Sequence, residues 1–145
     1  MKSYADTSFL VSLYSSDANS ARADLWRQAN PAPLPFTSLH ALEFRNALWQ
    51  SAFKKIRNPN DVREVFREIE TDIATGLLIK PAGVFDEVWK QACDLADAHT
   101  MALGARSLDI LHVAAARWLQ VEELVTFDQR QAALVLRIGL KVAVI

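Results

Sequence analysis

The sequence has almost no cysteine and no long uninterrupted apolar run. Cys93 is the only cysteine among 145 residues, which excludes an internal disulfide and fits a reducing cytoplasm. The strongly apolar stretch 108–119 contains Asp109, His112 and Arg117 and is too short to span a bilayer. We therefore expect neither a disulfide framework nor a membrane span.

Positive and negative side chains nearly balance, with 16 Lys and Arg against 17 Asp and Glu. The formal net charge of −1 argues against a protein that coats DNA non-specifically, but not against a nuclease, because local charge steers a substrate. His40, His99 and His112 lie far apart in the sequence, so a structural zinc site is not expected. The chain runs from Met1 almost directly into an expected strand, so we expect no signal peptide.

One basic cluster stands out. Lys54, Lys55 and Arg57 are followed by Arg63 and Arg67 on the next expected helix. One interpretation is a solvated helix end, where cations interact favourably with the helix dipole. The other is a surface that binds phosphate groups.

Short strand-like runs alternate with longer helical patterns along the chain. The expected strands are 2–5, 34–36, 77–79, 124–127 and 140–145. The expected helices are 7–14, one through Trp26 capped by Asp17 or Ser20, one from Thr37 or Ser38 to about Ile56, 61–75, one from Val84 to about Met101, 107–119 and 128–138. This alternation predicts right-handed βαβ units and a parallel sheet covered on both faces. With no repeat or linker, we expect one α/β domain over residues 1–145.

Four acidic residues lie at strand ends or inside apolar helices, namely Asp6, Glu43, Asp109 and Asp128. Ligands of open α/β sheets bind outside the carboxyl ends of the strands, where Asp6 and Asp128 are expected. A carboxylate beside a core is costly unless a positive group meets it, and few Lys or Arg residues are near enough in the sequence to meet all four. A divalent cation with hard oxygen ligands is the common solution, which predicts a Mg²⁺-dependent phosphodiesterase.

Three of these acids have ready structural explanations. Asp is a common N-cap just before a helix, which would explain Asp6 and Asp128. Glu43 alone carries little information, because it could project into solvent or pair with Arg45.

Asp109 is harder to explain as a surface residue. Its helix is apolar on most sides, so the position is expected to be partly buried. The structural alternative is a salt bridge to Arg106, three residues earlier.

The order and context of the acids resemble the PIN-domain proteins of the VapC type, the toxins of bacterial and archaeal toxin–antitoxin pairs. The motifs are Asp6-Thr7-Ser8 after the first strand, Glu43 with Asn46, Arg106-Ser107-Leu108-Asp109 leading into 114–116, and Val125-Thr126-Phe127-Asp128. No single motif is specific, but together they cover nearly the whole chain. The resemblance implies a three-layer α/β/α sandwich with a five-stranded parallel sheet, and a metal-dependent endoribonuclease.

The resemblance also implies the roles of the acids. Asp6, Asp109 and Asp128 would chiefly hold Mg²⁺ or Mn²⁺, and Glu43 would hold metal or position water. The candidates around them are Thr7, Ser8, Asn46, Thr126 and His112. Each has a structural alternative too: helix capping for the two hydroxyls after Asp6, strand preference for the threonine, and core packing for the histidine.

The resulting hypothesis is hydrolysis of RNA by metal-activated water, which leaves 5′-phosphate and 3′-hydroxyl ends. The expected substrate is RNA. Trp26, Trp49, Trp89 and Trp118 exceed what a small core must hide, so part of the surface is expected to serve interfaces. The resemblance implies that these are a homodimer contact and a groove for a cognate antitoxin, which inserts a basic side chain. A non-catalytic PIN-like module that binds RNA or protein is the alternative. A phosphatase with an aspartyl nucleophile is a weaker one, because Asp6-Thr7-Ser8 lacks a second Asp two residues on.

Overall fold

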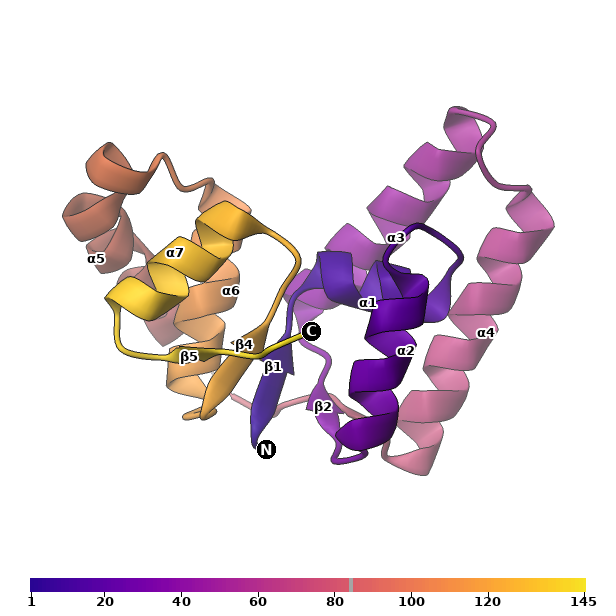
Figure 1. The fold of residues 1–145 in the computed structure, drawn as a ribbon, viewed down its shortest axis with the longest axis horizontal. Coiled ribbons are helices and arrows are strands. Elements are labelled where there is room, and N and C mark those ends of the chain that lie inside the picture. The colour runs from indigo at the N-terminus through magenta and orange to yellow at the C-terminus, as the bar shows by residue number, and fades with distance from the viewer. Residues whose placement is uncertain (84) are drawn as a thin grey trace. The chain divides into compact units, whose positions relative to one another are not determined.

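The computed structural model describes residues 1–83 and 85–145, and these form two compact units. The first unit comprises Met1–Asp6 and Ala82–Val144, and the second comprises Thr7–Pro81 with Ile145. The elements, in chain order (Figure 1), are β1 (Ser3–Ala5), α1 (Thr7–Tyr14), α2 (Ser20–Ala29), β2 (Leu34–Pro35), α3 (Ser38–Phe53), α4 (Pro59–Thr75), β3 (Leu78–Ile79), α5 (Phe85–Leu103), α6 (Ser107–Trp118), β4 (Glu123–Val125), α7 (Gln129–Arg137) and β5 (Lys141–Val142). The predicted α/β class is confirmed.

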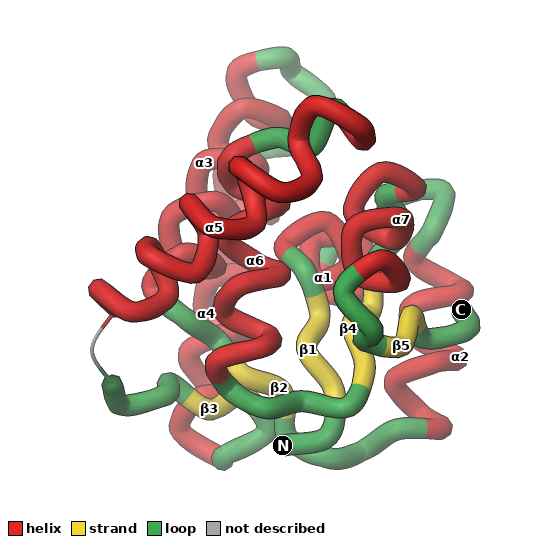
Figure 2. Tube along the Cα trace, turned by 90° about the vertical axis from the view of Figure 1, so that its left-hand side faces the viewer, coloured by secondary structure: helices red, strands yellow, loops and turns green. Residues whose placement is uncertain are grey.

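The first unit is built on a parallel sheet in the order β1-β4-β5. Tyr4 lies opposite Leu124 in the register of β1 and β4, and both side chains are fully buried. Helix α6 packs against α5, α7 and β4, and Figure 2 shows α5 lying along α6. Every residue from Ile110 to Ala116 is buried, which explains the nearly unbroken apolar sequence of this helix.

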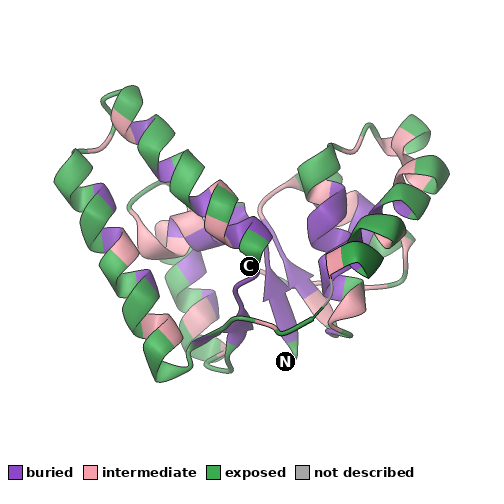
Figure 3. Cartoon of the chain, turned by 180° about the vertical axis from the view of Figure 1, so that it is seen from behind, coloured by how far each residue is buried: buried purple, intermediate pink, exposed green. Residues whose placement is uncertain are grey.

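The second unit combines the parallel pair β2–β3 with four helices. Helix α1 packs against α2, α3 and α4, and α3 packs against α4. Phe9 meets the Trp26 ring edge to face, with ring centroids 5.2 Å apart. Phe44 is buried on α3 and contacts Phe36 in the same geometry. Figure 3 shows the resulting pattern on the longer helices α3 and α4, with buried residues on one side and exposed residues on the other.

Local capping explains where the longest helices begin and end. Thr37 caps α3 in a capping box with His40, whose ring Nδ1 accepts the Thr37 backbone N–H at 3.0 Å. The Asn58 side chain caps α4, which places the first helical residue at Pro59, where a missing N–H has no cost. Gly76 ends α4 with φ of 80°, a left-handed conformation that favours glycine. Two of these signals, a capping Thr37 and a stop at Gly76, were predicted from the sequence.

The predicted single five-stranded sheet is wrong. Five strands with parallel pairing are present among the described residues, but β1, β4 and β5 form one sheet and β2 and β3 form another. The strands β2, β3 and β5 have two residues each, so each ladder makes few hydrogen bonds and extends less far than the predicted strands. The predicted helix start at Val84 lies outside the described residues. No helix in the described part of the chain is both long and apolar enough to span a membrane.

Candidate functional site

The carboxyl ends of β1 and β4 place Asp6 and Thr126 next to each other in the first unit. The Asp6 backbone N–H donates to the Val125 carbonyl at 3.0 Å, which extends the pairing of the two strands by one residue. The Thr126 hydroxyl then donates to Asp6 Oδ2 at 2.6 Å. Asp6 is 4% exposed, so this hydroxyl helps to satisfy a buried carboxylate. Thr126 thus contacts one of the four candidate acids, and its role at a metal site stays a prediction.

Asp128 is the N-cap of α7. Its Oδ1 accepts the backbone N–H groups of Arg130 at 2.8 Å and Gln131 at 3.0 Å, and its own N–H donates to Thr126 Oγ1 at 2.9 Å. The structural alternative of a capping role for Asp128 is therefore confirmed. Because the cap uses only Oδ1, the Oδ2 atom faces other groups.

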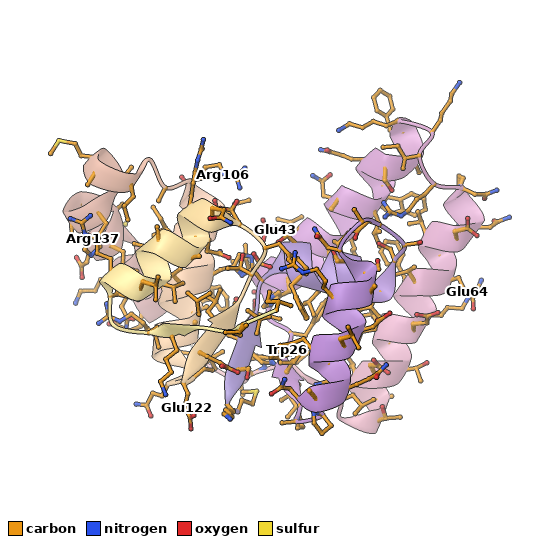
Figure 4. The ribbon with its side chains drawn as sticks, in the orientation of Figure 1. Trp26, Glu43, Glu64, Arg106, Glu122 and Arg137 are labelled. Carbon is orange, nitrogen blue, oxygen red and sulfur yellow. The ribbon has the colours of Figure 1, made fainter. Side chains whose placement is uncertain are left out.

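Arg106 joins the start of α6 to the start of α7. Its Nε donates to Asp109 Oδ2 at 2.8 Å and its Nη2 donates to Asp128 Oδ2 at 3.0 Å. The Arg106 side chain is 65% exposed, against 17% for Asp109 and 27% for Asp128, and Figure 4 shows Arg106 where the two helices begin. One cation is thus shared by two carboxylates that are 19 residues apart in the sequence, from 128 − 109.

This bridge corrects one expectation. The salt bridge between Asp109 and Arg106 was the structural alternative, and it is present. The sequence suggested Arg106 as a partner for Asp109 alone, whereas α6 and α7 pack together and the one guanidinium also reaches Asp128. Asp109 keeps its predicted partial burial.

Gln131 also connects the two acids and was not predicted. Its backbone N–H donates to Asp128 Oδ1, and its side-chain Nε2 donates to the Asp109 carbonyl at 3.4 Å. The residue is 1% exposed, and among the described residues its Oε1 has no hydrogen-bond partner. Its sequence signal was a polar residue on the buried face of an amphipathic helix, one turn before Leu134 and Val135.

Glu43 belongs to the second unit, on α3. The Thr7 hydroxyl donates to Glu43 Oε1 at 2.9 Å, and Thr7 is buried at the start of α1, directly after Asp6 in the chain. Arg45, the suggested partner of Glu43, forms an exposed ion pair with Glu70 at 3.8 Å. The Thr7 hydroxyl therefore holds the carboxylate of Glu43, one of the four candidate acids.

The remaining candidates are one histidine in the core and two polar residues at the surface. His112 is buried, and its Nδ1 shares a hydrogen bond of 2.7 Å with the Tyr4 hydroxyl, which supports the interpretation of a core residue. Ser8 and Asn46 are exposed on α1 and α3. The structure thus brings Asp6, Asp109 and Asp128 onto elements of the first unit that contact one another.

The three arginines of the basic cluster make local contacts in the second unit. Arg57 donates to Ser15 Oγ at 3.0 Å, and the Arg63 guanidinium lies over the Trp49 ring. Arg67 pairs with Glu64, one turn earlier. These contacts favour the solvated-helix interpretation over a phosphate-binding surface.

Comparison with known proteins identifies the family. A model of the PIN domain matches residues 3–135. The chain belongs to the PIN domain family. Its fold is similar to a crystal structure of FitAcB from Neisseria gonorrhoeae, with a TM-score of 0.62 and 15% identity over 97% of this chain and 95% of that chain.

A second solved structure agrees. PAE2754 from Pyrobaculum aerophilum is similar with a TM-score of 0.55 and 20% identity, over 92% of this chain and 84% of that chain. No curated protein matches the sequence. At these identities the two solved structures establish the fold alone, while the family model establishes that this is a PIN domain.

PIN domains are generally nucleases and typically depend on a divalent metal, so the acids can be tested against such an ion. In residues 1–83 and 85–145, no group of three or more His, Cys, Asp or Glu side chains is arranged to hold one. Two carboxylates do converge on a single cation, the Arg106 guanidinium. Carboxylate oxygens are the ligands that Mg²⁺ prefers, so the side chains of Asp109 and Asp128 fit a divalent ion in their chemistry.

Proposed function

We propose that this PIN domain is a metal-dependent endoribonuclease of the VapC type, the toxin of a toxin–antitoxin pair. The observation that carries the proposal is the convergence of Asp109 and Asp128 on one cation. Asp6 follows β1, the strand paired with β4, and is linked to Asp128 through the Thr126 hydroxyl. PIN-family membership and the order of the motifs support a nuclease.

In this mechanism Asp6, Asp109 and Asp128 hold Mg²⁺ or Mn²⁺. When bound, such an ion lowers the pKa of water and polarises a phosphoryl oxygen. Thr126 fixes the orientation of Asp6 through its hydroxyl, and the two backbone N–H groups at the start of α7 fix Asp128. The resemblance adds Glu43 as the fourth acid, and the Thr7 hydroxyl donates to its Oε1. Water attacks the RNA phosphodiester, leaving 5′-phosphate and 3′-hydroxyl ends.

The proposed macromolecular partners are an antitoxin and a second copy of this chain. Apolar side chains remain exposed on α3, where Leu42 is 68%, Trp49 40% and Phe53 86% exposed. Their spacing of seven and four residues places them on one helix face, and large apolar surface of this kind often serves an interface. Light scattering that shows a strict monomer at micromolar concentration would remove the dimer from this proposal.

A non-catalytic module that binds RNA or protein is the second candidate. It is favoured by one observation, that Arg106 already forms ion pairs with Asp109 and Asp128 without a metal. A module of this kind would bind single-stranded RNA equally well with and without divalent metal, and would leave the RNA intact.

Cleavage of a single-stranded or loop-containing RNA separates the two candidates. The purified protein is incubated with labelled RNA in Mg²⁺, in Mn²⁺ and in excess EDTA. We expect cleavage only with metal, and loss of at least about a hundredfold in rate for Asp6→Asn and Asp128→Asn, since charge-stabilising groups contribute on this scale. Asp97→Asn, an exposed position on α5, is the matched control and should cleave normally. Full cleavage in EDTA, or normal cleavage by Asp6→Asn, would overturn the proposal.

A further inference from the structure

Arg106 is bonded to both acids through adjacent donors of one planar group. Its Nε and Nη2 belong to the same guanidinium, so Asp109 Oδ2 and Asp128 Oδ2 lie within hydrogen-bond reach of a single positive charge. Charge-assisted bonds of this kind are stronger than bonds between neutral groups. The guanidinium therefore stands where two carboxylates already converge.

Helix capping already uses one of the two carboxylate oxygens of Asp128. Asp128 Oδ1 is used by two backbone N–H groups of α7, so Oδ2 is the atom that remains for a cation. Both acids are mostly buried, whereas the Arg106 side chain is 65% exposed. Helix capping fixes Asp128, while Arg106 has a long flexible stem that can turn into solvent.

We propose that Arg106 and the divalent ion compete for Asp109 and Asp128, so that the ion binds only when it displaces the guanidinium. This inference rests on the proposed metal site and adds its regulation. A divalent ion and a guanidinium on the same oxygens would repel each other, and carboxylates bound to Mg²⁺ direct their lone pairs to it at short range. Arg106 thus stabilises the metal-free protein and lowers its apparent metal affinity.

The opposite role is also physically reasonable and makes the opposite prediction. Arg106 would then be a positioning residue that stays bonded to the outer side of the two carboxylates and orients them toward the ion. Removal of its side chain would loosen the acids and weaken metal binding. The sign of the change in affinity therefore decides between competition and positioning.

The test is a Mn²⁺ titration of the full chain, followed by calorimetry or by electron paramagnetic resonance, for wild type, Arg106→Met and Arg117→Met. Arg117 is an exposed arginine at the other end of α6, and its variant should bind like wild type. Competition predicts that Arg106→Met binds Mn²⁺ about two- to tenfold more tightly, as expected from the loss of two partly exposed ion pairs. Unchanged or weaker binding by a folded Arg106→Met would overturn the inference.

Two further measurements keep the test decisive if Arg106→Met folds poorly. Arg106→Lys keeps the charge but loses the planar fork, so competition predicts an affinity between those of wild type and Arg106→Met, whereas a wild-type or weaker affinity contradicts it. In wild type, Mg²⁺ should shift the NMR signal of the Arg106 Nε–H and speed its exchange with water, while the Arg117 signal stays unchanged. A protected, unshifted Arg106 signal at saturating Mg²⁺ would contradict displacement.

The Mn²⁺ titration and the RNA cleavage assay test the competition and the proposed ribonuclease independently. Tighter Mn²⁺ binding by Arg106→Met without any RNA cleavage would support the competition and refute the proposed ribonuclease. Cleavage by wild type with unchanged affinity in Arg106→Met would do the reverse.

Discussion

Thr126 donates its hydroxyl hydrogen to Asp6 Oδ2 at 2.6 Å and so links the residue after β4 to the residue after β1. Both residues are buried, at 6% and 4% exposure. The bond therefore lies where an unsatisfied carboxylate oxygen is costly. It connects strand pairing to the orientation of a proposed metal ligand.

The first prediction concerns this hydroxyl. Thr126→Val keeps the shape of the side chain and removes the donor, so we expect a loss of about 1–3 kcal/mol in the free energy of unfolding. Urea unfolding in EDTA measures it. Thr126→Ser keeps the hydroxyl and should lose much less. Equal losses in the two variants would mean that packing of the methyl group, and not the hydrogen bond, is responsible.

The second prediction separates the structural and functional roles of Asp109. Asp109→Asn removes a charge that is paired with an exposed arginine, so the metal-free protein should lose no more than about 1 kcal/mol of stability. Mn²⁺ affinity and RNA cleavage should both fall sharply, because a carboxylate ligand is lost. Thermal melts in EDTA and a Mn²⁺ titration measure the two effects. A large loss of stability with unchanged Mn²⁺ affinity would identify Asp109 as a structural acid alone.

The third prediction concerns a titrating group in the second unit. The Tyr14 hydroxyl donates to Asp72 Oδ2, and burial first, then the bond and charge of Asp72, raise the pKa of Tyr14 well above its usual value. The folded protein thus holds this proton longer than the unfolded chain does. The resulting stability is present below the ordinary Tyr pKa of about 10 and is lost as pH rises above it.

Tyr14→Phe tests this linkage. We expect a loss of about 1–2 kcal/mol at neutral pH and a smaller decline in stability between about pH 10 and 11 than in wild type. Urea unfolding across that range measures both. Parallel pH profiles for wild type and Tyr14→Phe would contradict the raised pKa.

The fourth prediction follows from Gln131 Oε1, which has no hydrogen-bond partner within residues 1–83 and 85–145. Gln131→Met fills similar space and removes a buried polar atom without a partner, so its stability should lie within about 1 kcal/mol of wild type or above it. Gln131→Glu places a third carboxylate near Asp109 and Asp128 and should destabilise by several times more. Chemical denaturation at pH 7 measures both. A severely unstable Gln131→Met would mean that the weak bond to the Asp109 carbonyl matters more than its length suggests.

Local signals in the sequence were enough to predict most helices. Helix α1 has the predicted bounds, Thr7–Tyr14, because apolar residues recur at helical spacing directly after Asp6. Gly76 ends α4 as predicted, because its left-handed conformation does not depend on distant residues, but α4 begins at Pro59, two residues before the predicted start at Asp61. Such signals act within one helical turn, so they can be read from the sequence without knowing how the helices pack.

Pairings between distant segments were harder to predict. Strands of two residues, such as β2 and β5, carry too little alternation to reveal which neighbour they pair with, so the division into two sheets was not predicted. The bond from Arg106 to Asp109 is local and was considered, but the bond to Asp128 requires α6 and α7 to begin side by side. The same packing places Gln131 between the two acids.

Oxygen labelling of the cleavage products tests the central claim most directly. RNA is cleaved by the wild-type protein with Mg²⁺ in water enriched in ¹⁸O, and the new ends are analysed by mass spectrometry. Attack by water, as proposed for the site of Asp6, Asp109 and Asp128, predicts one ¹⁸O atom in each new 5′-phosphate and an unlabelled 3′-hydroxyl. Unlabelled 2′,3′-cyclic phosphate ends, or the absence of any cleavage, would contradict it.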